Sequence, residues 1–218
     1  VIAREPDLRC ITALWSPSTG VADSHSYMLG LQGDAESNGT MLAFFAPVES
    51  AELQDDGICL NVGGNDPMQL KAKTVINAAG LHTQKLTHEF KGFPKEKIPV
   101  WHYCKGNYYS LSGCKAPFTS LIYPAPEEAG LGVHLTLDLA GQARFGPDVE
   151  WIDKINYDVD PKRSDSFYAA VRKYWPDIPD NSLQPGYSGI RPKIQAPGEP
   201  ATDYVIQGPR DHGIDGLI

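Results

Sequence analysis

The hydrophobic and polar positions of the 218-residue chain follow two periods, one typical of strands and one typical of helices. Residues 8–15 (LRCITALW) and 41–46 (MLAFFA) are largely apolar runs. They predict two strands, the second of them buried on both faces. Between these runs, Asp23 or Ser24 can cap a helix that stops at Gly39. The N-terminal part of the chain therefore predicts a strand, a helix and a second strand.

The next part of the chain predicts an antiparallel meander and then a strand–helix junction. Residues 48–53, 58–62 and 68–72 are short strand-like segments separated by turn sequences rich in Asp, Asn and Gly. An apolar strand over residues 74–80 (TVINAAG) ends in small residues, and a helix is predicted over residues 81–90. Small side chains let a ligand approach the backbone closely. The alternative is an ordinary packing turn, which many α/β proteins contain.

Beyond this helix the chain is rich in Pro, Gly and aromatic residues, which predicts a second, β-rich region. Polar and apolar positions alternate in residues 132–138 (GVHLTLD), so His134, Thr136 and Asp138 share one face of a strand. A later helix starts at Asp160, and its apolar positions recur at helical spacing. The pattern predicts further strands over residues 102–111, 120–123, 142–145, 187–191 and 204–207.

Composition and charge narrow the classes of function. The chain is 41% hydrophobic and 21% charged, which is ordinary for a soluble globular protein, and no apolar run approaches the roughly 18 residues of a membrane helix. A net charge of -8 without a basic stripe argues against nucleic acid as a partner. No cysteine pair has C-x-x-C spacing, so we expect no metal site. Scattered thiols indicate a reducing compartment, in the cytoplasm or at the periphery of a membrane.

Candidate catalytic and binding residues follow from side-chain chemistry. A histidine on the polar face of a strand can act as a general base, and His134 beside Thr136 is the first candidate. The alternative is a histidine that is only hydrogen-bonded at the sheet surface. A guanidinium suits a carboxylate substrate, which favours Arg191, with Lys105 second unless it is simply a solvated charge. Two aromatic side chains can line the same pocket: Tyr108 and Tyr123.

Short segments in a fixed order carry a family resemblance. They are SPSTGVAD (16–23), NAAG (77–80), KGNYY (105–109), LIYP (121–124), GLGVHLTLD (130–138), FGPD (145–148) and YSGIRPK (187–193). NAAG alone is common, but the ordered set covers nearly the whole chain. It resembles the FAD-dependent oxidoreductases of the D-amino-acid-oxidase-like superfamily, and within them the branch of L-2-hydroxyglutarate dehydrogenases and oxidases.

The resemblance implies an α+β fold of two interleaved domains. Residues 1–22 and 93–184 would form a substrate domain built on an antiparallel β-sheet. Residues 23–92 and 185–218 would form the α/β FAD-binding portion. The cofactor-binding residues that the resemblance implies are Val48, Asn77, Ala78, Ala79, Gly80, Leu81, Gly189, Ile190 and Arg191.

The family reaction, by resemblance, oxidises the C2 alcohol of a small-molecule 2-hydroxy acid, such as L-2-hydroxyglutarate, to a 2-oxo acid. Hydride passes to the flavin, and His134 would take the hydroxyl proton while Arg191 binds the carboxylate. The electron acceptor stays open between oxygen and a quinone. Two alternatives remain at this stage: an amine or amino-acid oxidase of the same superfamily, and a non-catalytic β-rich binding module.

The chain departs from the family pattern at both ends. It contains no G-x-G-x-x-G unit, which cradles the FAD pyrophosphate in full-length members. Its last residues are Gly216, Leu217 and Ile218, where members continue into a segment that touches the flavin. We therefore expect a fragment of a longer flavoenzyme that binds FAD poorly and is inactive by itself.

Overall fold

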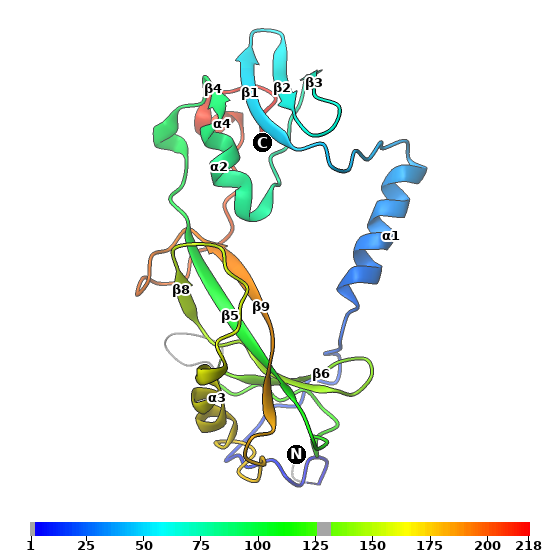
Figure 1. Ribbon diagram of the computed structural model, residues 1–218, viewed down its shortest axis with the longest axis vertical. Coiled ribbons are helices and arrows are strands. Elements are labelled where there is room, and N and C mark those ends of the chain that lie inside the picture. The colour runs from blue at the N-terminus through cyan, green and yellow to red at the C-terminus, as the bar shows by residue number, and fades with distance from the viewer. Residues whose placement is uncertain (1–2, 126–131) are drawn as a thin grey trace. The chain divides into compact units, whose positions relative to one another are not determined.

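The described residues of the computed structural model, 3–125 and 132–218, divide into two units (Figure 1). Unit 1 comprises Val1–Leu31 and Tyr103–Arg191, and unit 2 comprises Gln32–His102 and Pro192–Ile218. Each unit is therefore assembled from two segments that lie far apart in sequence. Gly130 and Leu131, which belong to one of the segments that carry the family resemblance, lie outside the described residues.

Unit 2 contains the predicted meander. Strands β1 (Val48–Gln54), β2 (Gly57–Val62) and β3 (Met68–Ala72) pair antiparallel, and β4 (Phe90–Lys91) adds parallel to the other edge of β1. The strand order is β3-β2-β1-β4. The three predicted strands are confirmed. They form because the Gly- and Asp-rich turns between them let the chain reverse tightly. The core of this unit is formed by Ala51, Ile58, Leu60, Phe90, Phe93 and Leu217.

The strand–helix junction is less regular than the sequence predicts. In place of a strand over residues 74–80, only Val75 makes a bridge, a parallel one to Leu217. The helix predicted over residues 81–90 is divided into η1 (Gly80–His82) and α2 (Thr83–His88). A strand is sustained only by neighbours that satisfy its backbone groups, and here a single short neighbour does so. Two further short elements lie in unit 2: η2 (Lys95–Lys97) and α4 (Pro209–His212).

Predicted strands over residues 8–15, 41–46 and 204–207 are wrong. None of these segments has a ladder partner among the residues that the structure describes, and large apolar side chains in them are exposed. Phe45, for example, is 90% exposed. Apolarity alone therefore fixes neither burial nor strand structure, because a segment becomes a strand only where another strand pairs with it.

Helix α1 (Ser24–Ser37) confirms the predicted helix and its cap. The Asp23 carboxylate accepts hydrogen bonds from the backbone N–H groups of His25 and Ser26, both at 3.1 Å, which satisfies two donors of the first turn. No residue of α1 is buried. Among the described residues no helix is long and apolar enough to cross a membrane.

Unit 1 is built on a five-stranded sheet. Strands β6 (His134–Leu137), β7 (Ala143–Gly146), β5 (His102–Leu111) and β8 (Glu150–Ile152) lie in that order, and β9 (Leu183–Lys193) also pairs with β5. The β6–β7, β7–β5 and β5–β8 pairs are antiparallel. Of the strand predicted over residues 120–123, only the bridge between Ile122 and Leu135 forms.

One face of the unit 1 sheet packs on a helical segment. Asp160 caps η3 (Pro161–Arg163), accepting from the Lys162 N–H at 2.9 Å, and α3 (Ser164–Val171) follows beside the sheet (Figure 1). Odd-numbered positions of the three neighbouring strands face this core, and even-numbered positions face the other way. The core residues are Tyr109, Phe118, Leu135, Ala143, Phe145, Phe167, Val171, Tyr174, Trp175, Ile178 and Leu183.

Candidate functional site

The sheet face opposite α3 carries most of the predicted substrate residues. Register pairs His134 on β6 with Gly146 on β7, and the neighbouring β5–β7 pairs place Tyr108 opposite the same glycine. Gly146 has no side chain, so the Tyr108 ring can lie against it. A Cβ built there would come within 2.8 Å of the ring. The glycine therefore brings the histidine and the tyrosine toward each other across one strand.

Tyr108 is the centre of a cluster of aromatic and cationic side chains. The ring of Tyr187 on β9 stacks on it, with centroids 4.5 Å apart and planes inclined by 7°. Arg191, further along β9, places a guanidinium nitrogen 3.4 Å from where a Cβ would lie at Gly106. Burial raises the pKa of the Tyr108 phenol and Tyr187 adds to the effect, whereas Arg191 acts in the opposite direction. The phenol is therefore protonated near neutral pH and can donate a hydrogen bond.

His134 contacts a different aromatic ring, that of Tyr123. Its ring lies 3.9 Å from the Tyr123 ring, centroid to centroid, at an angle of 31°, and the residue is 5% exposed. Tyr123 is also close enough to Tyr108 for its charge to influence the pKa of that phenol. Thr136 shares the face of His134, and its hydroxyl donates to the Arg144 carbonyl at 3.4 Å. The structure thus brings together the predicted His134, Tyr108, Tyr123 and Thr136 on one face.

Lys105 lies apart from this cluster. It sits at an odd position of β5, so its side chain leaves the face opposite to that of Tyr108. The residue is 4% exposed, and its ammonium donates to the Asp158 carbonyl and lies 3.9 Å from the Glu150 carboxylate. A cation held in this way is not available to a substrate, so we leave Lys105 out of the site.

Two side chains of the cluster were not among the sequence-based candidates. Tyr187 stacks on Tyr108, and the guanidinium carbon of Arg144 lies 5.5 Å from the Tyr187 ring centroid. The sequence does indicate the direction of the Arg144 side chain. Arg144 is at an even position of the strand predicted over residues 142–145, and even positions face the candidate site. Tyr187 shares a face with Arg191 in the strand predicted over residues 187–191, but its contact with Tyr108 depends on the pairing of β9 with β5 across a long sequence separation.

The NAAG junction of unit 2 has the features of a backbone ligand site. The Asn77 amide donates to the Thr87 hydroxyl at 3.0 Å, and its carbonyl accepts from the Ala79 N–H at 3.3 Å. These bonds fix the turn while Ala78, Ala79 and Gly80 stay exposed. Within the described residues, the N–H groups of Ala78 and Gly80 donate no hydrogen bond, and no atom lies within 4 Å of a Cβ built at Gly80. Such a turn fits the close approach of a nucleotide.

The other predicted cofactor residues are divided between the units. Val48 begins β1 and Leu81 lies in η1, both in unit 2. Gly189, Ile190 and Arg191 lie on β9 in unit 1.

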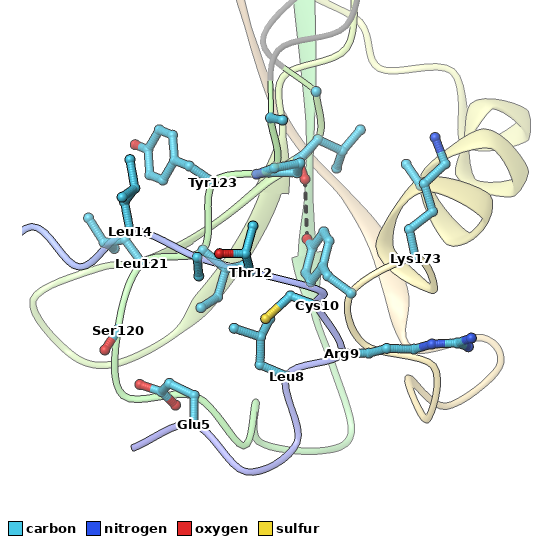
Figure 2. A pocket seen from close by; sticks show the side chains of 18 of the residues that line it. Glu5, Leu8, Arg9, Cys10, Thr12, Leu14, Ser120, Leu121, Tyr123 and Lys173 are labelled. Atoms are coloured by element: carbon cyan, nitrogen blue, oxygen red, sulfur yellow. Dashed lines mark hydrogen bonds between the residues drawn. The ribbon is translucent and has the colours of Figure 1, made fainter. Parts of the chain in front are cut away.

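A cavity of about 1400 Å³ in unit 1 borders the cluster through Tyr123. Figure 2 shows the N-terminal segment, with Leu8, Cys10 and Leu14, on one side of it and the Ser120–Tyr123 stretch close by. Of the residues that line the cavity, Tyr174 donates its hydroxyl hydrogen to the Val133 carbonyl at 3.2 Å. Most of the N-terminal residues that line the cavity are exposed.

Solved structures resemble the chain in fold. Glycine oxidase from Geobacillus kaustophilus matches with a TM-score of 0.72 and 18% identity, covering 99% of this chain and 53% of its own. L-proline dehydrogenase from P. horikoshii matches with a TM-score of 0.73 and 14% identity, covering 99% of this chain and 55% of its own. At such identities the likeness shows the fold alone, and the predicted α+β fold of two domains is confirmed.

Sequence comparison gives the family. The mitochondrial L-2-hydroxyglutarate dehydrogenase of Arabidopsis thaliana is 40% identical over an alignment of 253 positions that covers 98% of this chain and 52% of the relative. The chain thus spans about half the length of this relative. The family described as FAD dependent oxidoreductase matches residues 1–215. The resemblance predicted from the ordered segments is therefore confirmed, and the chain belongs to the FAD-dependent oxidoreductase family.

Proposed function

We propose that this chain supplies the substrate-binding side, and part of the FAD-binding side, of an enzyme that oxidises the C2 alcohol of a 2-hydroxy acid to a 2-oxo acid. The observation that carries the proposal is the meeting of His134, Tyr108 and Arg191 in one unit, in a chain 40% identical to a protein named L-2-hydroxyglutarate dehydrogenase. We assign unit 1 to the substrate and unit 2 to the cofactor; the predicted substrate domain covers residues 1–22 and 93–184, whereas unit 1 covers Val1–Leu31 and Tyr103–Arg191.

His134 is assigned as the base. When hydride leaves C2 of the substrate, the hydroxyl proton must also leave, and an imidazole takes it with a suitable pKa. FAD supplies the hydride acceptor when it is bound. The contact with Tyr123 limits the orientations of the imidazole ring. The C–H bond loses its electron pair as hydride, the O–H bond loses its proton to His134, and a carbonyl forms.

Arg191 is assigned to the carboxylate beside the reacting carbon. A guanidinium presents two parallel N–H donors to a carboxylate, and Arg191 is exposed at the end of β9. The protonated Tyr108 phenol lies close enough to donate to the same group. Thr136 and Tyr123 line the site on the β6 side. Together these residues hold C2 of the substrate in a fixed orientation, which is the main way that binding energy lowers such a barrier.

The cofactor side is assigned to the NAAG turn. Asn77 fixes the turn, and Ala78, Ala79 and Gly80 present exposed backbone to the nucleotide part of FAD. We assign secondary contacts to Val48, Leu81, Gly189 and Ile190. The electron acceptor, oxygen or a quinone, and a location in the cytoplasm or at the periphery of a membrane stay predictions.

Flavin bleaching tests the proposed function. The flavin-loaded, full-length protein is mixed without oxygen with L-2-hydroxyglutarate and, separately, with glycine, sarcosine and D-alanine. Loss of flavin absorbance with L-2-hydroxyglutarate alone is the expected result. Reduction by the amines alone would instead make the protein an amine oxidase. A protein that holds no flavin at all would return the chain to the non-catalytic alternative.

A further inference from the structure

Arg144 occupies the middle of the candidate site's sheet face. It lies on β7, two positions before Gly146, and register pairs it with Thr136 on β6 and Ser110 on β5. Its side chain therefore leaves the sheet on the same face as His134. A guanidinium at this position rises from the central strand of three, beside the row that contains the proposed base.

The contacts of Arg144 leave its guanidinium able to bind an anion. Its carbon lies 5.5 Å from the Tyr187 ring centroid, and Tyr187 stacks on Tyr108. Its acidic neighbour is Asp138, at 3.5 Å between nitrogen and oxygen, with side chains 40% and 28% exposed. A long and solvated ion pair of this kind contributes little. Within the described part of the chain, the guanidinium donates no hydrogen bond.

The two arginines of the site are connected through the stacked tyrosines. Arg144 lies near Tyr187, Tyr187 stacks on Tyr108, and Arg191 is close enough to influence the Tyr108 phenol. The exposed part of the aromatic pair offers an apolar surface between two cations. This order of cation, apolar surface and cation matches a short carbon chain with a carboxylate at each end.

We propose that Arg144 binds the distal carboxylate of a dicarboxylic 2-hydroxy acid, while Arg191 binds the carboxylate beside the reacting carbon. The inference rests on the proposed function and adds the residue that selects dicarboxylates over monocarboxylates. Arg144 accounts for this selection because a monocarboxylate would leave its N–H donors without the charged partner that a dicarboxylate provides.

A pair of substrates that differ only in the distal carboxylate tests the assignment. The flavin-loaded enzyme and its Arg144→Met variant are assayed with L-2-hydroxyglutarate and with L-2-hydroxyvalerate. The variant should lose about 10- to 100-fold in kcat/KM on the dicarboxylate, as expected for charge-assisted hydrogen bonds, and keep its value on the monocarboxylate. Arg144→Lys should lose less, because the charge stays while the planar fork is lost.

Equilibrium binding gives a readout that does not depend on turnover. Titration calorimetry with glutarate and with valerate should show the same selective loss for glutarate. The matched control is Arg172→Met, since Arg172 also pairs with an aspartate, Asp180, and lies 5.1 Å from the ring centroid of a tyrosine, Tyr168, at the end of α3. This control should leave both substrates unchanged.

The outcomes separate the inference from the proposed function. Equal losses on both substrates would make Arg144 a structural residue and overturn the assignment, as would no loss on either. A wild-type enzyme that uses both substrates equally well would keep the proposed function and overturn the selection of dicarboxylates. A wild-type enzyme that oxidises neither acid would overturn the proposed function itself.

Discussion

Substitution of Gly146 by alanine should disturb both the stability and the substrate site of unit 1. A Cβ at this position would lie 2.6 Å from the backbone oxygen of Asn107 and 2.8 Å from the Tyr108 ring. The oxygen belongs to the central strand β5 and cannot rotate away, so either the strand or the ring must move. Gly146 also has a φ of 141°, which L-residues rarely adopt.

The two effects can be given separate magnitudes. Forcing an alanine into an unfavourable φ costs about 1–2 kcal/mol, and crowding a packed region costs about 1–3 kcal/mol more. Gly141→Ala is the matched control, because Gly141 has a φ of 78° in the same unit and no atom within 4 Å of its built Cβ. The difference between the two variants therefore reports the crowding at Gly146 together with the less favourable φ of 141°.

Thermal unfolding and substrate kinetics measure these effects on the flavin-loaded enzyme. At about 2–4 °C for each kcal/mol, Gly146→Ala should melt several degrees below Gly141→Ala. Its KM should rise because Tyr108 is displaced, whereas Gly141→Ala should keep the wild-type KM. Equal melting temperatures and equal KM values for the two variants would refute the packing of Tyr108 against Gly146.

Three further predictions concern single side chains. His134→Ala should lower kcat by about 10²–10⁴-fold with normal flavin content, and an unchanged kcat would leave His134 a structural residue. Arg191→Lys should raise KM more than it lowers kcat, because the bidentate fork is lost, and steady-state kinetics with equal KM values would contradict this. Burial opposes ionisation of Glu5, but hydrogen bonds from Ser120 and Thr119 outweigh it and lower its pKa. A lowered pKa adds stability that is present above the unfolded value of about 4.3 and disappears as the pH falls through the folded value. Glu5→Gln should therefore melt below wild type at neutral pH, and the gap should close in acid; a constant gap would exclude this linkage.

Local signals predicted the elements whose partners are close in sequence. The meander over residues 48–72 formed as expected, because each strand pairs with the next through a short turn. The cap of α1 by Asp23 was equally local. Residues 8–15 and 41–46 were predicted as strands on apolarity alone and form none, because strand formation depends on a distant partner that apolarity does not identify.

The alternation of side chains between the two faces of a strand predicts part of the candidate site. Period two placed His134 and Thr136 on one face, and the structure agrees. The same rule applied to β5 separates Lys105 from Tyr108, since the two differ by an odd number of positions. The participation of Tyr187 required the pairing of β9 with β5, which is not encoded in either segment alone.

The two faces of β5 have different roles. Side chains at odd positions stabilise the strand, and side chains at even positions face the candidate binding site. Asn107, at an odd position, is fully buried. Its backbone N–H donates to the Asp148 carboxylate at 2.8 Å, and its side-chain amide donates to Asp148 at 3.0 Å and to Glu150 at 2.8 Å. Asp148 also accepts from the Arg163 Nε at 2.7 Å. Together with Lys105, these groups place two cations beside two carboxylates, so the network is close to neutral.

The charge on the binding face therefore comes from Arg144 and Arg191, with the Asp138 carboxylate beside Arg144 offsetting part of it, rather than from the network beneath it. The chain as a whole carries -8, and a distant negative charge is weakened by solvent and salt, whereas two guanidiniums within the site act at contact distance. An acidic protein can in this way present a locally positive surface that favours anionic substrates. A salt titration separates the two contributions: rising ionic strength should raise KM for a dicarboxylate more than for a monocarboxylate. Removing Arg144 should abolish that difference, because only the distal carboxylate depends on it.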